Sequence, residues 1–176
     1  MRKLAVLILF VATTLLASIK SSEAQPLKSP GQINWMTIQE AAAAFNNEPR
    51  KIFVDVYTGW CGWCKKMDAT TFKDADVADY INNNFYAIKL NAEMKDSIIF
   101  NQTLYKYNPE FKAHELAVSW LNQKMTYPSY VFLNEQWQVL SPVPGYQKKE
   151  ALLPILQYFG DNIYLNKSWV DYSKEL

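Results

Sequence analysis

The stretch IFVDVYTGWCGWCKK, residues 52–66, contains the only two cysteines of this 176-residue chain, Cys61 and Cys64. Its first six residues are apolar, β-branched or aromatic around a single acid, Asp55, and this composition indicates a buried strand. The residues after the second cysteine contain neither Gly nor Pro as far as Phe72 and favour a helix. A Cys-x-x-Cys pair at a strand-to-helix turn is typical of a redox motif.

The N-terminus has the pattern of an export signal. Two basic residues precede an apolar run, residues 4–16, of the length expected in a signal peptide. Small residues at the minus-three and minus-one positions predict cleavage after Ala24. We interpret residues 1–24 as a signal peptide, because the run is shorter than the roughly 20 apolar residues of a membrane span. An uncleaved N-terminal anchor helix is the alternative.

Charge and cysteine content narrow the function. The formal net charge is only +1 and no long block of like charge occurs, so the chain has no signature of a nucleic-acid-binding protein. A bond between Cys61 and Cys64 would close a very short loop and would constrain the unfolded chain little, which favours a chemical role. Half of a zinc site and an inert disulfide remain alternatives. A structural zinc site needs four ligands, and His114 is the only histidine.

The remaining chain is predicted to form one α/β domain, residues 33–160. The predicted elements are strand 33–35, helix 37–45, strand 52–57, the helix of the cysteine motif, helix 75–84, strand 85–90, a helical insertion around 91–112, helix 113–123, strand 129–133, strand 137–143 and helix 148–159. This order predicts a central mixed β-sheet with helices on both faces.

Two flanking segments complete the domain organisation. Residues 25–32 contain two prolines and a glycine and are predicted to form an irregular leader. Residues 161–176 are rich in apolar and aromatic side chains, so we expect this C-terminal tail to dock on the domain.

Residues 33–160 resemble the thioredoxin superfamily. The resemblance depends on the WCGWCK motif that begins at Trp60, the acid Asp55 six residues before the first cysteine, the Tyr127-Pro128 pair before strand 129–133, and Gly145 after the predicted hairpin. With its export signal, the chain is similar to the periplasmic thiol-disulfide interchange proteins of bacteria. The resemblance implies a thioredoxin fold and a redox-active Cys61–Cys64 disulfide.

The catalytic roles of three residues follow from this resemblance and from elementary chemistry. Cys61 is expected at a helix N-terminus, where the helix dipole favours the attacking thiolate. Cys64, one turn further, is expected to resolve the mixed disulfide. Asp55 is expected to have a raised pKa because of burial, and could take the proton of Cys64.

Five residues are expected to bind substrate. Trp60 and Trp63 form an apolar rim beside Cys61, and Gly62 allows a substrate chain to approach closely. The resemblance implies that Tyr127 and a cis Pro128 face the disulfide and present backbone groups to an incoming peptide.

We therefore predict an exported, periplasmic thiol-disulfide oxidoreductase that acts on protein thiols and disulfides, in the reductase or isomerase direction. It would need a membrane-bound or exported electron donor, and neither a cofactor nor a metal is expected. The alternatives are a disulfide oxidase and a thioredoxin-fold binding module with a non-catalytic cysteine pair. The ending Lys174-Glu175-Leu176 makes the endoplasmic reticulum a second possible location. His114 is interpreted as a surface or helix-capping residue.

Overall fold

A five-stranded mixed sheet forms the centre of the molecule. The structure, a computed structural model, describes residues 31–176, so the predicted signal peptide and most of the predicted leader lie outside the described residues. The strands follow the order β1 (Trp35–Met36), β3 (Phe85–Asn91), β2 (Lys51–Tyr57), β8 (Ser129–Leu133) and β9 (Val139–Pro144). The first three are parallel, and β8 and β9 are antiparallel to their neighbours.

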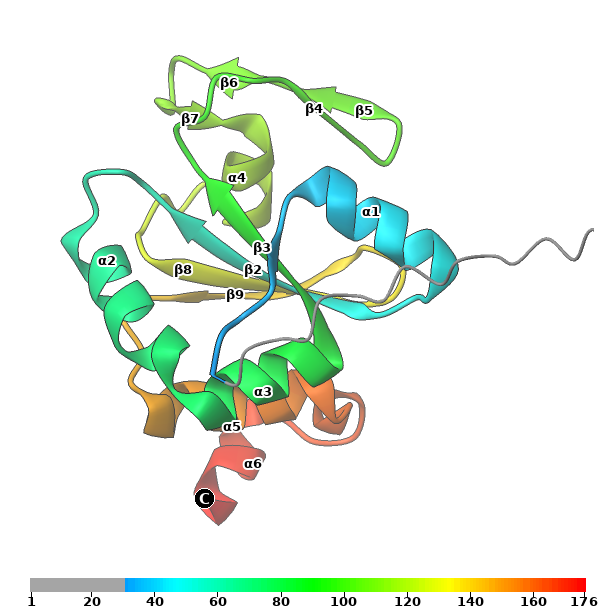
Figure 1. The fold of residues 1–176 in the computed structure, drawn as a ribbon, viewed down its shortest axis with the longest axis vertical. Helices are drawn as coiled ribbons and strands as arrows, with labels where there is room; N and C mark the ends of the chain where they lie inside the picture. Colours follow the sequence, from blue (N-terminus) through cyan, green and yellow to red (C-terminus); the bar gives the residue numbers. More distant parts are fainter. Residues whose placement is uncertain (1–30) are drawn as a thin grey trace, which may run out of the picture.

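Helices cover both faces of this sheet (Figure 1). One face carries α1 (Ile38–Asn47) and α4 (Glu115–Trp120), and the other carries α2 (Gly62–Ala69), α3 (Ala75–Asn84) and α5 (Lys149–Gly160). The central strand β2 is consequently buried along all of its residues except Tyr57, which explains its continuous apolar run. The predicted α/β class with helices on both faces is confirmed.

Two helix starts follow the signals in the sequence. Thr37 and Glu40 form a capping box: the Glu40 amide donates to Thr37 Oγ1 at 3.2 Å, and the Thr37 amide donates to Glu40 Oε2 at 2.7 Å. Asp74 caps α3 by accepting the amide hydrogens of Asp76 and Val77. None of the helices between residues 31 and 176 has both the length and the apolarity needed to cross a membrane.

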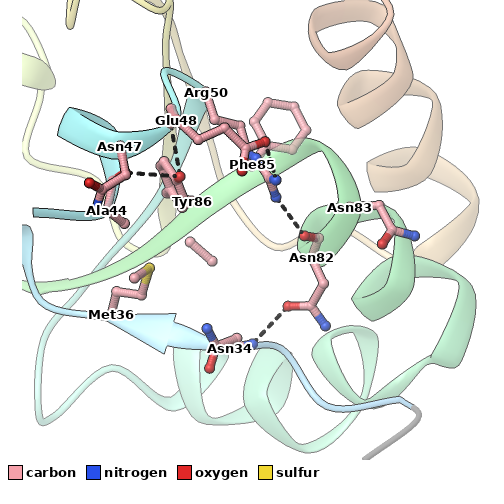
Figure 2. Close-up of a pocket in the computed structure, with 11 residues that line it drawn as sticks. Asn34, Met36, Ala44, Asn47, Glu48, Arg50, Asn82, Asn83, Phe85 and Tyr86 are labelled. Atoms are coloured by element: carbon pink, nitrogen blue, oxygen red, sulfur yellow. Dashed lines mark hydrogen bonds and ion pairs between the residues drawn. The ribbon is translucent and has the colours of Figure 1, made fainter. Parts of the chain in front are cut away.

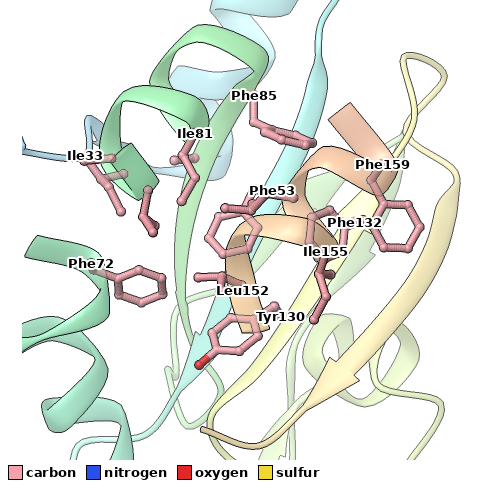
Figure 3. Packing of buried hydrophobic residues seen from close by; sticks show 14 of the residues in the cluster. Ile33, Phe53, Phe72, Ile81, Phe85, Tyr130, Phe132, Leu152, Ile155 and Phe159 are labelled. Atoms are coloured by element: carbon pink, nitrogen blue, oxygen red, sulfur yellow. The ribbon is translucent and has the colours of Figure 1, made fainter. Parts of the chain in front are cut away.

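Aromatic side chains dominate the core beneath α2, α3 and α5. The ring of Phe53, on β2, is fully buried and lies 5.5–6.4 Å, centroid to centroid, from five other rings. Figure 3 shows Phe53 among the aromatic rings of this core. These rings belong to Trp35, Phe72, Phe85, Tyr130 and Phe132. Phe53 therefore joins the sheet to the helical layer from the middle of the central strand.

The predicted helical insertion around residues 91–112 is wrong, because this segment forms short strands. β4 (Ile98–Phe100) pairs with β5 (Thr103–Tyr105), and β6 (Tyr107–Asn108) pairs with β7 (Ala113–His114). Burial alternates along β4, as in a strand with one covered face. The intervening Asn101 and Gln102 both have positive φ, which matches a two-residue hairpin turn.

The predicted helix over residues 113–123 is shorter than expected. Its first two residues belong to β7, and α4 ends at Trp120. Asn122 and Gln123 both adopt positive φ, a conformation that stops an α-helix.

The C-terminal segment continues beyond α5 through η2 (Ile163–Leu165), α6 (Trp169–Tyr172) and η3 (Ser173–Glu175). The hydroxyl of Tyr158, on α5, donates to the carbonyl of Lys167 at 2.8 Å. The Tyr158 ring also lies 5.3 Å from the Trp169 ring and 5.6 Å from the Tyr172 ring. These contacts hold the segment against α5.

We predict that Phe53→Ala lowers the free energy of unfolding by about 3–5 kcal/mol, because it removes a buried ring and leaves a cavity. Urea denaturation of the oxidised protein measures this loss. Ile99→Ala is a matched control, since the Ile99 side chain is 70% exposed and its removal should change stability by less than about 0.5 kcal/mol. Equal losses in the two variants would contradict the central position of Phe53.

Candidate active site

The two cysteines lie where the central strand passes into a helix. β2 ends at Tyr57, and after a short turn Cys61 becomes the N-cap residue of α2. Cys61 and Cys64 form a disulfide with their Cα atoms 5.3 Å apart, and each residue is only 4% exposed. The sulfur of Cys61 accepts the backbone N–H of Cys64 at 3.0 Å. The same amide and the helix dipole would stabilise a Cys61 thiolate after reduction.

A tryptophan precedes each cysteine in the sequence, and both indoles are exposed. Trp60 is 67% exposed and Trp63 is 58% exposed. The Trp60 ring meets the Tyr127 ring edge-on at 6.0 Å, and its Nε1–H donates to Glu93 Oε1 at 3.0 Å. The Trp63 ring lies 5.2 Å from the Tyr146 ring. Both indoles are therefore fixed by contacts although they face solvent.

The Tyr127-Pro128 pair belongs to the same region. Its peptide bond is cis, and the Pro128 carbonyl accepts the Gly145 amide at 2.8 Å. Apart from the two chain neighbours and the α2 backbone, no described residue lies within 4 Å of the position that a Cβ atom on Gly62 would occupy. The Trp60–Tyr127 contact places the Tyr127-Pro128 pair next to the cysteine motif, which contains the other residues predicted to bind substrate. Their role in binding stays a prediction.

Asp55 lies within β2 and is almost completely buried, with 2% exposure. Its Oδ2 is 3.7 Å from the ammonium nitrogen of Lys89, and its Oδ1 has no hydrogen-bond partner among the described residues. Burial raises the pKa of Asp55 from 3.8 to about 7, although the Lys89 charge opposes the change. Near neutral pH such a carboxyl group can both accept and release a proton.

Three residues around Asp55 were not predicted from the sequence. Lys89 on β3 and Tyr130 on β8 stand directly opposite Asp55 in the two ladders of β2. Asp68, four residues after Cys64 on α2, binds the Lys89 ammonium at 2.5 Å. A lone lysine inside the apolar run 85–90 was the available signal for Lys89, because a buried charge needs a partner.

His114 caps a helix, but the alternative that it lies on the surface is wrong. Its Nδ1 accepts the Leu116 amide at the start of α4 at 3.3 Å, and the residue is fully buried. Burial lowers the pKa of its imidazole. Among residues 31–176, no group of three or more His, Cys, Asp or Glu side chains is arranged to hold a metal ion.

The structure has a polar cavity of about 370 Å³, and Figure 2 shows the residues that line it. Its lining includes Asn34, Asn82, Tyr86 and Arg50, and the Arg50 guanidinium donates to the Asn82 carbonyl at 3.1 Å. Arg50 immediately precedes β2, whereas the cysteines follow the end of that strand. The cavity and the disulfide therefore occupy opposite ends of the sheet.

A disulfide in the first turn of the helix that follows the central strand, with a buried acid in that strand, defines the class of the thioredoxin-fold thiol-disulfide oxidoreductases. The family model Thioredox_DsbH, described as a protein of unknown function, DUF255, matches residues 18–150. The chain belongs to this thioredoxin-like family.

Individual relatives agree with this assignment. The thiol:disulfide interchange protein DsbD of Pseudoalteromonas atlantica is 31% identical over 65 residues, which are 36% of this chain and 11% of that protein. The chain thus spans about a tenth of the length of this curated relative.

Two of the solved structures that are similar to this chain carry names that refer to oxidoreductase or disulphide-isomerase activity. A DsbH oxidoreductase superposes with a TM-score of 0.54 and 15% identity, over 80% of this chain and 95% of its own length. At that identity the likeness shows the fold alone. A Bacteroides thetaiotaomicron protein, provisionally named a disulphide isomerase, superposes with a TM-score of 0.52 and 26% identity, over 74% of this chain and 95% of its own.

We predict that Asp55→Asn stabilises the oxidised protein at pH 8 by on the order of 4 kcal/mol and has little effect at pH 4. The folded state holds the Asp55 proton more tightly than the unfolded state does, since burial raises its pKa to about 7. The parent protein therefore loses stability as the pH rises from about 4 to 7, and the Asn variant lacks this loss. Urea denaturation at several pH values measures the difference.

The matched control is Asp79→Asn, which makes the same chemical change at an exposed position of α3. Its effect should be small at every pH. A difference between Asp55→Asn and the parent protein that does not vary with pH would contradict the burial argument.

Proposed function

We propose that the chain exchanges its Cys61–Cys64 dithiol with disulfides of protein substrates. The observation that carries this proposal is the placement of the Cys61 sulfur at the N-terminus of α2, where it accepts the Cys64 amide. A dithiol in this place is activated on one sulfur only, because the helix terminus favours negative charge on Cys61.

The reaction has two displacement steps. The Cys61 thiolate attacks a substrate disulfide, a mixed disulfide forms, and the first substrate sulfur leaves and takes a proton from solvent. Cys64 then gives its proton to Asp55 and attacks the Cys61 sulfur, which releases the second substrate sulfur as a thiolate. The substrate is reduced by two electrons and the Cys61–Cys64 disulfide forms.

The rim around Cys61 is suited to an extended, partly apolar protein segment. Trp60 and Trp63 offer exposed rings that neighbouring side chains already hold, so binding costs little side-chain entropy. Gly62 leaves room for a backbone to approach, and the Tyr127-Pro128 pair offers backbone groups. These five residues are our proposed substrate-binding set.

The favoured direction is reduction or isomerisation. The WCGWCK motif resembles thioredoxin more than the strong oxidases, and the Bacteroides relative is provisionally named an isomerase. Because about 30 mV of reduction potential corresponds to 1.4 kcal/mol, small differences around the disulfide decide the direction. A glutathione titration of the Cys61–Cys64 pair measures the potential, and a value near that of DsbA, about −120 mV, would instead indicate an oxidase.

We predict that Cys64→Ser traps substrate proteins as mixed disulfides on Cys61, because the resolving sulfur is missing. Non-reducing gels of cells that express the variant would show these adducts, and dithiothreitol would release them. The control is the Cys61→Ser/Cys64→Ser double variant, which should trap nothing.

In parallel, the parent protein should accelerate insulin reduction by dithiothreitol, and Cys61→Ser should not. An empty trap together with an inactive parent would favour the thioredoxin-fold binding module.

The proposed location is the periplasm, after removal of residues 1–24. The N-terminal pattern supports export, and the named relative DsbD is a thiol:disulfide interchange protein. In an oxidising compartment, a reductase needs a membrane-bound or exported electron donor to keep its dithiol reduced.

We expect the exported protein to begin at Gln25. Expression of the full chain in a bacterial host, followed by mass spectrometry of the periplasmic fraction, measures the mature N-terminus. Replacing Ala24 with a bulky residue such as Phe should block cleavage at this site. Recovery of the intact chain in the membrane fraction of the parent would support the anchored alternative instead.

A further inference from the structure

Three charged residues from three elements meet where α2 packs on the sheet. Asp55 comes from β2, Lys89 from β3 and Asp68 from α2. The Lys89 ammonium nitrogen lies 2.5 Å from Asp68 Oδ1 but 3.7 Å from Asp55 Oδ2. The lysine therefore hydrogen-bonds to the partly exposed acid and only faces the buried one.

The position of Asp68 links this cluster to the dithiol. Asp68 follows Cys64 by four residues, so the two side chains occupy the same face of α2 one turn apart. Its side chain is 42% exposed, whereas Asp55 is buried. Asp68 can thus hold its charge in contact with water while it binds Lys89 at the edge of the apolar interior.

Two aromatic rings help to fix the position of the Lys89 ammonium group. Its ammonium lies 5.4 Å from the centroid of the Trp35 ring and 5.0 Å from that of the Tyr57 ring. Both rings favour a cation at that place. Asp68 then decides which carboxyl group the ammonium binds.

We propose that Asp68 is a positioning residue for the resolving step: by binding the Lys89 ammonium, it keeps that charge beyond hydrogen-bonding distance of Asp55, which leaves Asp55 able to act as the base for Cys64. The inference rests on the proposed role of Asp55 in the exchange reaction. Without Asp68, Lys89 would bind Asp55 and hold it as a carboxylate, which makes Asp55 a weaker base.

The other groups that face Asp55 agree with this assignment. From β8, the hydroxyl of Tyr130 is buried and has no hydrogen-bond partner among the described residues. Burial raises the pKa of Tyr130, and the Asp55 charge raises it further, so this group stays neutral. From α2, Asp68 raises the pKa of Asp55, whereas Lys89 on β3 lowers it. Lys89 and Asp68 are thus the two charged residues that act on Asp55 among the described residues.

The test is a titration of the Asp55 carboxyl group by carbon-13 NMR in the oxidised protein. Asp68→Asn should lower the midpoint by about one pH unit or more, because Lys89 becomes free to pair with Asp55. Asp68→Glu, which keeps the charge, should restore a midpoint near that of the parent. Asp79→Asn on α3 is the matched control and should leave the midpoint unchanged.

A double variant separates the action through Lys89 from the direct action of the Asp68 charge. In the Lys89→Met background the midpoint should rise, and the further effect of Asp68→Asn should be clearly smaller than in the parent. An equally large effect in both backgrounds, or an unmoved midpoint in Asp68→Asn alone, would overturn the proposal.

The catalytic consequence is measured separately by stopped-flow fluorescence of Trp60 and Trp63 during reduction of a model disulfide. The pH profile of the resolving step should move downward in Asp68→Asn, together with the NMR midpoint. A moved midpoint with an unchanged pH profile would overturn the positioning role. A moved midpoint without exchange activity in the parent at any pH would overturn the proposed function, and the positioning role with it.

Discussion

The burial of one carboxyl group inside the central strand is the constraint on which the site depends. β2 bonds to β3 on one side and to β8 on the other, and helices cover both of its faces, so Asp55 has no route to water along the sheet. A charged carboxylate in such a place costs desolvation free energy, and this cost raises the pKa of Asp55 to about 7. The same packing that stabilises the fold therefore produces a carboxyl group that can exchange a proton near neutral pH, as the proposed role of Asp55 requires.

The register of the sheet selects the neighbours of this acid. Parallel pairing sets Lys89 opposite Asp55, and antiparallel pairing sets Tyr130 on its other side. A slip of one residue in either ladder would turn these side chains to the opposite face, where α1 and α4 pack. The sheet register thus determines which residues neighbour Asp55, just as the cysteine motif determines which residues flank the disulfide.

Local signals predicted most of the fold, whereas contacts between distant segments stayed hidden. The capping box at Thr37, the acid before α3 and the strand before the cysteines each depend on residues a few positions apart. The insertion was predicted wrongly because all three residues of β4 are apolar, so the alternation of buried and exposed side chains along this strand cannot be read from the residue types. The ion pair between Lys89 and Asp68 joins residues 21 positions apart, and only the packing of α2 on the sheet brings them together.

The insertion has a further consequence for the rim of the site. The Ala92 amide donates to the carbonyl of Tyr57 at 2.8 Å, and the His114 amide donates to the carbonyl of Ala92 at 2.6 Å. The start of the insertion is therefore bonded to the end of β2, just before the cysteine motif, and the residue pair that follows the insertion is bonded back to its start. Glu93, at its start, holds the Trp60 indole in place through a hydrogen bond. An exposed tryptophan fixed in this way presents a preformed apolar surface next to Cys61, which suits the proposed substrate-binding role of Trp60, because the ring would not have to be ordered on binding.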